Sequence, residues 1–391
     1  MLSLPLAAES PVAGVVADLA IILLAAKLGD ELFKRIGQPA LIGEILAGLL
    51  IGPSVLGIVE PGETVEVFAE LGVVFLLFWV GLETKLSDMR EVGANAGLAG
   101  VGGVILPFAA GTAAGLIFGE STATSVFIGS ALAATSVGIT SAVFAELGIL
   151  ATRAARTVLG AAVIDDILAL LLVAVAVGIA AEGGIDVASI AVSAALAFGF
   201  IAVFALGGTA VMRRMPQLLH APRFAESPLL PAVILCLGIA AIAAKIGLAA
   251  VIGAFLAGMI VAETKEQHPI EDEIAPLYAF FPPFFFASIG LQLDLDVLIE
   301  TGTLLLVVGL SALAAVTKLI GTWPGARNLG HREGRIVAVG MVPRGEVGII
   351  VAGIGAASGV VDTELFAAIV GMSIVTTLTV PPFLRRLAAP D

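Results

Sequence analysis

The sequence has little charge, and this shortage limits what the chain can be. Only 13% of its 391 residues are charged, whereas 59% are apolar. An ordinary soluble domain has about a quarter of its residues charged, so water cannot be the main solvent of this chain. Acidic residues outnumber basic ones by 32 to 19, which disfavours nucleic-acid binding. The composition therefore predicts an integral membrane protein with no nucleic-acid partner.

Cysteine and the usual chemical motifs are also scarce. Cys236 is the only cysteine, so no intramolecular disulfide can form. The sequence contains no phosphate-binding glycine loop, no zinc-ligand spacing and no nucleophile with an adjacent base. We therefore expect a protein that is not an enzyme and that needs no cofactor.

Long apolar runs fill most of the chain instead. A helix needs about 20 apolar residues to cross about 30 Å of hydrocarbon, and the runs between glycine, proline and charge predict about thirteen such helices. Their expected starts lie near residues 13, 38, 63, 88, 123, 154, 187, 228, 248, 273, 297, 334 and 363. The sequence thus predicts an all-α polytopic membrane protein, with one membrane domain over residues 1–391 and no soluble regulatory domain.

Basic residues predict the orientation of the chain, because cytoplasmic loops of membrane proteins are enriched in lysine and arginine. If the N-terminus lies outside, the basic residues of the predicted loops all fall on the cytoplasmic side, except Lys245. We therefore expect an N-terminus outside the cell and a cytoplasmic C-terminus.

The sequence also repeats itself. Three motifs recur at nearly the same offset: LIGEILAGLLIG from Leu41 as VIGAFLAGMIVA from Val251, FLLFWVGL from Phe75 as FFFASIGL from Phe284, and VGI from Val137 again from Val347. The offset covers an odd number of predicted helices, so the second copy must enter the membrane in the opposite direction. This is the inverted-topology repeat of many secondary transporters, and it favours alternating access over a channel or an intramembrane enzyme.

Two adjacent acids stand at membrane depth. Asp165 and Asp166 lie near the middle of a predicted span bounded by Arg156 and Glu182. Intramembrane carboxylates are costly and usually mark ion or proton pathways, whereas a purely structural ion pair is the less favoured alternative for two neighbours. Adjacent helical positions are about 100° apart, so both carboxylates can border one polar cavity. Their titration is expected to be coupled.

Lys318 is the expected counter-charge of this pair. It is the only lysine deep in a predicted helix core. Its ammonium would offset the cost of burying an aspartate. The alternative is a lysine that extends its ammonium to the membrane surface.

Two segments interrupt the helical pattern at corresponding places of the two copies. Residues 134–140 read ATSVGIT, and residues 341–349 read MVPRGEVGI. Their Thr, Ser, Gly and Pro residues predict helices that are unwound at mid-membrane, where freed carbonyls can face an ion cavity. Arg344 and Glu346 would then neutralise opposed half-helix ends.

The segments VIDDILAL, ATSVGIT, GLETKL and PRGEVG, together with the Lys318 helix, resemble the sodium/proton antiporters of the monovalent cation:proton antiporter superfamily, in its electrogenic paired-aspartate branch. The resemblance covers essentially the whole chain. It implies two crossed discontinuous helices, elevator-like motion and a homodimer in a prokaryotic cell membrane. The implied core helices lie at 86–182 and 295–388, the dimerisation helices at 12–83 and 226–292, and a linker helix and loop at 187–225.

The resemblance also implies roles for single residues. Asp166 would be the main carboxylate for Na⁺ or Li⁺, and Asp165 would be the partner of Lys318. Thr135 and Ser136 would lie close to the ion. Na⁺ or Li⁺ and H⁺ would be the substrates, and they would compete at the aspartate pair.

Several other protein classes fit these residues less well. Potassium-efflux relatives usually have Gln, and electroneutral relatives Asn, where this chain has Asp165. Bile-acid-type sodium symporters share the architecture but lack the adjacent acids. Intramembrane aspartyl proteases need two Asp on separate helices, and a passive channel is less suited to buried opposite charges. Exchange of K⁺ for H⁺ by the same fold stays open, as does, more weakly, a sodium-coupled organic-anion symporter.

Overall fold

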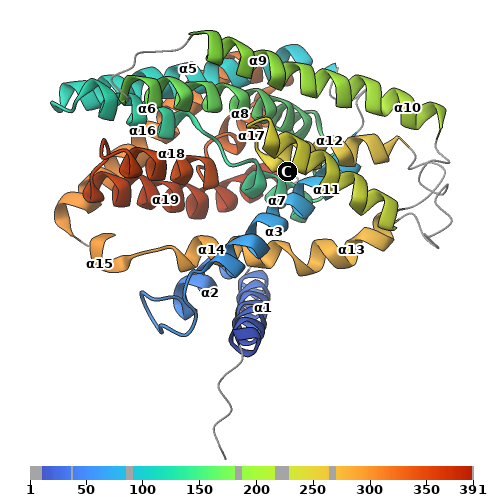
Figure 1. Ribbon diagram of the computed structural model, residues 1–391, viewed down its shortest axis with the longest axis horizontal. Coiled ribbons are helices and arrows are strands. Elements are labelled where there is room, and N and C mark those ends of the chain that lie inside the picture. The colour runs from blue at the N-terminus through green and yellow to red at the C-terminus, as the bar shows by residue number, and fades with distance from the viewer. Residues whose placement is uncertain are drawn as a thin grey trace, which may run out of the picture. The chain divides into compact units, whose positions relative to one another are not determined.

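The computed structural model describes residues 11–36, 38–84, 91–180, 187–215, 229–263, 270–298 and 300–389. All regular structure in these residues is helical (Figure 1). A helix satisfies its backbone N–H and C=O groups within one segment, which hydrocarbon requires. The helices are α1 Pro11–Arg35, α2 Ala40–Ile51, α3 Glu63–Leu82, α5 Gly93–Ile117, α6 Thr122–Ala133, α7 Val137–Glu146, α8 Arg153–Ala180, α9 Val187–Ala202, the π-helical turn η1 Val203–Gly208, α10 Thr209–Arg214, α11 Leu229–Lys245, α12 Ala250–Ala262, α13 Glu271–Phe280, α14 Pro282–Leu291, α15 Leu295–Leu298, α16 Thr301–Ala326, the 3₁₀ turn η3 Arg327–Leu329, α17 His331–Gly340, α18 Glu346–Ala357 and α19 Thr363–Ala388.

The predicted helix starts near 88 and 228 fall outside the described residues. Each of the others lies within a few residues of an observed start. Among the described residues, 8 helical segments are long and apolar enough to cross a membrane. Four more apolar helices are shorter, at Ala40–Ile51, Leu229–Lys245, Ala250–Ala262 and Val347–Ala356. The all-α membrane fold is therefore confirmed, whereas the number of thirteen spans stays a prediction.

Side chains at the helix ends explain several of these boundaries. The Ser121 hydroxyl accepts the Thr124 N–H at the start of α6, and the Asp362 carboxylate accepts the Leu365 N–H at the start of α19. Both are N-caps, which satisfy a backbone donor that the first helical turn leaves free. Two prolines open α14, where the missing N–H costs nothing.

Contacts divide the chain into two units, residues 1–73 with 277–295 and residues 74–276 with 296–391. In the first unit, α2 packs against α1 and α14. In the second unit, α5 packs against α6, α8 and α16, and α16 packs against α19. Helices α11 and α12, which the resemblance assigns to dimerisation, belong to the second unit by these contacts. The division into core, linker and dimerisation helices therefore stays a prediction.

Glycines at matching positions of the two repeat copies make the same close helix–helix contacts. In the first unit a Cβ on Gly48 would overlap the Ala287 carbonyl, and a Cβ on Gly290 would overlap the Ile45 carbonyl. The repeat relates these positions to four residues of the second unit. There, a Cβ on Gly258 would overlap the Phe78 carbonyl, and a Cβ on Gly81 would overlap the Phe255 carbonyl. The α2–α14 and α3–α12 pairs thus use the same close backbone packing, while the opposite membrane directions of the two copies stay a prediction.

Candidate ion-binding site

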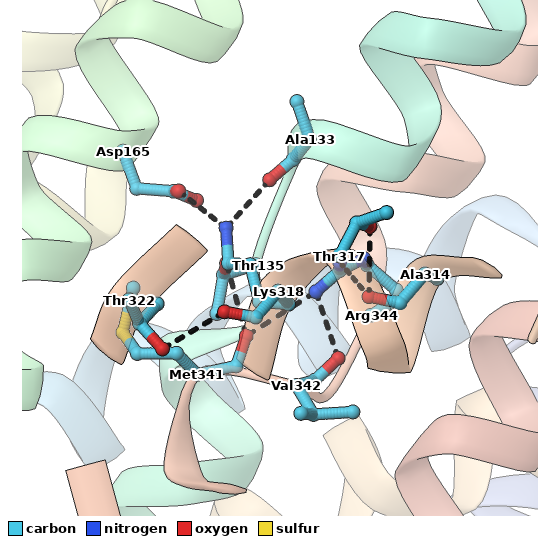
Figure 2. Close-up of polar contacts among 10 residues, drawn as sticks. All are labelled: Ala133, Thr135, Asp165, Ala314, Thr317, Lys318, Thr322, Met341, Val342 and Arg344. Carbon is cyan, nitrogen blue, oxygen red and sulfur yellow. Dashed lines mark hydrogen bonds and ion pairs between the residues drawn. The ribbon is translucent and has the colours of Figure 1, made fainter. Parts of the chain in front are cut away.

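The centre of the site is an ion pair between α8 and α16. Lys318 Nζ lies 2.6 Å from Asp165 Oδ1, and both side chains are fully buried. The same Nζ donates a hydrogen bond of 2.8 Å to the carbonyl oxygen of Ala133, the last residue of α6 (Figure 2). Lys318 thus binds one carboxylate and one backbone carbonyl at the C-terminal end of α6. The structure brings Asp165 and Lys318 together, and the lysine does not reach a membrane surface.

Small residues on α5 make room for this lysine. A Cβ on Gly102 would overlap the Gly321 carbonyl, so α5 and α16 approach at backbone distance. A Cβ on Gly103 would lie 3.4 Å from Lys318 Cε and 2.9 Å from Thr322 Cγ2. Glycine at these positions therefore lets α16 lie close enough to α5 to hold Lys318 in place.

Asp166 lies in a different environment from its neighbour. Its side chain is buried and borders a cavity with about 10 Å³ of room for water-sized molecules. That room is about the minimum that one water molecule needs. The other lining residues are all apolar and come from α3, α7, α8 and the α12 region: Leu77, Val137, Leu159, Val163, Val251, Ile252 and Phe255. Asp166 thus lies at a narrow space between apolar side chains.

The two predicted helix interruptions are present and touch each other. Residues 134–136 separate α6 from α7, and residues 341–345 separate α17 from α18. The Ser136 N–H donates to the Pro343 carbonyl at 2.9 Å. The Thr135 hydroxyl donates to the Met341 carbonyl at 3.5 Å. Pro343 itself has no N–H and disfavours helix at the residue before it, which explains why the second helix unwinds here.

Arg344 binds the carbonyls that the second interruption leaves free. Its Nη1 donates to the carbonyl oxygens of Met341 at 3.2 Å and Val342 at 2.7 Å, and its Nη2 donates to that of Ala314 at 3.2 Å (Figure 2). The side chain is fully buried. A guanidinium at the carbonyl end of α17 opposes the negative end of that helix. The other predicted compensating residue, Glu346, begins α18, and its side chain lies outside the described part of the structure.

The described charges of the site balance. Asp165, Asp166, Lys318 and Arg344 are all buried, with exposed fractions of at most 6%. If all four are ionised, their two negative and two positive charges sum to zero. A further buried cation would leave an uncompensated positive charge, which is strongly unfavourable in a low-dielectric interior. The arrangement can therefore take up one cation only if a positive charge leaves.

Some members of the site could not be named from the sequence. Ala133 and Ala314 contribute backbone carbonyls, which any residue type can provide. Thr376 and Thr377 of α19 bond the backbone of Arg344. The only sequence signal for them is a pair of hydroxyl residues inside an apolar helix, and threonine there most often bonds its own helix.

Comparisons with known proteins identify the family of the chain. The family model described as "Sodium/hydrogen exchanger, transmembrane" matches residues 19–386. The chain is 38% identical to the Na⁺/H⁺-K⁺ antiporter GerN of Bacillus cereus, over 94% of this chain and 95% of that protein. It is 35% identical to the high-affinity Na⁺/H⁺ antiporter NhaS3 of Synechocystis, over 96% of this chain and 90% of that protein.

A solved structure resembles the fold of the chain. The sodium proton antiporter MjNhaP1 of Methanocaldococcus jannaschii, at pH 8, matches with a TM-score of 0.69 and covers 96% of this chain and 97% of its own. The two sequences are only 17% identical, so this likeness concerns the fold alone.

Proposed function

Because the chain belongs to the sodium/hydrogen exchanger family, we propose that it is a secondary antiporter that exchanges Na⁺ or Li⁺ for H⁺. Membrane transport by antiport is the activity named for the curated relatives described above. For this chain we place the exchange in a prokaryotic cell membrane. The transported ions are substrates, and no cofactor takes part.

The balanced charge of the buried site carries the proposal. Among the described groups, two buried carboxylates accompany two buried cations, so a bound Na⁺ would leave an uncompensated positive charge unless one of these groups loses a proton. With all four groups ionised, only Lys318 can release this charge as a proton, because both carboxylates have already lost theirs and arginine keeps its own. An aspartate that is protonated can release a proton directly. This balance supports exchange of a cation for protons, because free conduction would need a site that tolerates excess charge.

The two aspartates have separate roles in this proposal. Asp166 borders the small cavity, so its carboxylate supplies the anionic oxygen that a hard cation prefers. Asp165 holds Lys318 while the site is empty. Thr135 and Ser136, in the first interruption, lie near the bound ion and offer oxygens to it. Na⁺ and H⁺ compete for this one site.

The loaded site moves across the membrane by elevator-like alternating access. The two crossed interruptions belong to the moving core, and the predicted dimerisation helices stay fixed in a homodimer. Inverted repeats provide outward-facing and inward-facing states of one site, which supports this mechanism. We also propose that the chain belongs to the electrogenic branch, which the pair Asp165 and Asp166 supports. The distribution of basic residues supports an N-terminus outside and a C-terminus in the cytoplasm.

K⁺ is the alternative cation, because the name of GerN includes it beside Na⁺. The experiment that decides between them uses purified protein in liposomes with a trapped pH-sensitive dye. Pulses of NaCl, LiCl and KCl at equal concentration are added from one side. We expect proton movement after Na⁺ and Li⁺ that exceeds the response to K⁺, and a response to K⁺ alone would contradict the proposed selectivity.

A further inference from the structure

Two adjacent threonines of α19 hold both backbone groups of Arg344. The Arg344 N–H donates to Thr376 Oγ1 at 3.1 Å, and Thr377 Oγ1 donates to the Arg344 carbonyl oxygen at 2.8 Å. All three residues are buried, with exposed fractions of at most 2%. Neighbouring residues of one helix thus bind the donor and the acceptor of one residue in a different segment.

The position of Arg344 explains why these bonds are needed. Arg344 lies in the non-helical run between α17 and α18, so its N–H and C=O have no partners in a helix of their own. Unsatisfied backbone groups are costly where water is excluded. The Thr376 hydroxyl donates to the carbonyls of Met372 and Ser373, each at 3.0 Å, which leaves its oxygen oriented to accept from Arg344.

The segment that contains Arg344 contacts both the first interruption and α16. Its preceding residue, Pro343, accepts the Ser136 N–H in the first interruption. Its guanidinium donates to the Ala314 carbonyl, one helical turn before Lys318 on α16. A shift of the Arg344 backbone would therefore move the partner of Ser136 and the helix that carries Lys318.

We infer that Thr376 and Thr377 are positioning residues that set the Na⁺ affinity of the site by fixing the backbone of Arg344. They do not touch the ion. Their two hydrogen bonds hold the second interruption against the first, so that Ser136 and the Asp165–Lys318 pair keep their relative places. This inference rests on the proposed exchange of Na⁺ for H⁺.

Valine substitutions test the inference, because valine has nearly the shape of threonine but no hydroxyl. We expect T376V and T377V each to raise the apparent KM for Na⁺ several-fold, and the double variant to raise it about tenfold or more, because each substitution removes one buried hydrogen bond. The maximal rate should stay within about twofold of the wild type, because the transported groups are intact. T376S and T377S restore the hydroxyl and should restore the KM.

Thr379 on the same helix provides the matched control. It is exposed, and its hydroxyl donates to the carbonyls of Val375 and Thr376 in its own helix. T379V should therefore leave the KM unchanged. An unchanged KM in the double valine variant, or serine variants as impaired as the valine variants, would overturn the inference.

A second readout separates this inference from the proposed function. Hydrogen/deuterium exchange of the amides in residues 342–347 is measured in purified wild-type protein and in the T376V/T377V variant, with T379V as control. We expect faster exchange only in the double variant, and equal exchange in all three would contradict the role of the threonines. If wild-type liposomes show no cation-driven proton movement, the proposed function fails, and the amide measurement still decides whether the threonines hold the segment.

Discussion

Asp165 and Asp166 are neighbours on one helix, but their described surroundings differ. Asp165 is fully buried and bonded to Lys318 through Oδ1, whereas its Oδ2 has no hydrogen-bond partner among the described residues. Asp166 borders a cavity large enough for about one water molecule. Neighbouring side chains of a helix point about 100° apart, so one aspartate can bind a buried ammonium while the other borders a cavity.

The largest expected effect is on transport in Asp166→Asn. An amide cannot supply the anionic oxygen that a hard cation prefers, and it cannot carry the transported proton. We expect exchange in liposomes to fall to the background of protein-free vesicles. The Asp165–Lys318 pair remains intact, so the thermal unfolding midpoint in detergent should stay close to that of the wild type. Transport like that of the wild type would show that Asp166 is not the ion-binding carboxylate.

Asp165→Asn should act mainly on stability, whereas Asp166→Asn acts mainly on transport. The variant leaves the Lys318 ammonium buried beside an amide, and removal of one partner of a buried ion pair costs about 3–5 kcal/mol. We expect a lower unfolding midpoint than in Asp166→Asn, measured by thermal denaturation of both proteins in the same detergent. As control, Asp165→Leu combined with Lys318→Leu removes both charges and should recover most of the loss. Equal stability of the two single Asn variants would remove the distinction between the aspartates.

Lys318→Gln should leave exchange measurable but change the charge that is moved. Without the ammonium, charge balance requires a proton on Asp165. Asp165 then keeps this proton, and the pair with Lys318 no longer takes part in exchange. The measurement is the rate of exchange at imposed membrane potentials of either sign. We expect the dependence on potential to differ from that of the wild type, and an identical dependence would exclude Lys318 from the charge balance.

Phe255→Leu should give the smallest effect. Phe255 lines the cavity beside Asp166, and a smaller side chain widens the access of water and ions to that carboxylate. We expect the maximal rate to rise a few-fold and the free energy of unfolding to fall by about 1–3 kcal/mol. Leu256→Val is the control, because Leu256 is equally buried on the same helix but does not line the cavity. The same change in rate in both variants would mean that the cavity wall has no special role.

Much of the site follows from the sequence, because a charge at membrane depth is rare and needs a partner. The pairing of Asp165 with Lys318 is the geometry that this charge argument predicts. The two interruptions are also readable, since Pro343 and the Thr, Ser and Gly residues near 135 disfavour a continuous helix. The helix starts follow from the apolar runs in the same way.

The rest of the site depends on contacts that no local pattern encodes. The second acceptor of Lys318 is the carbonyl of Ala133, and every residue has a carbonyl. The bonds from Thr376 and Thr377 join segments whose proximity only the fold determines. The apolar wall around Asp166 combines α3, α7, α8 and the α12 region, so Leu77 and Phe255 look like ordinary core residues in the sequence.

The central claim is that Na⁺ and H⁺ compete for one site at Asp166, and a kinetic measurement tests it most directly. Initial rates of exchange are measured in wild-type liposomes over a range of Na⁺ concentrations, at several fixed pH values. Direct competition predicts that the apparent KM for Na⁺ rises as the proton concentration rises, while the maximal rate at saturating Na⁺ stays constant. A maximal rate that falls with rising proton concentration, at an apparent KM that does not change across several pH units, would contradict the account and would require a separate path for the proton.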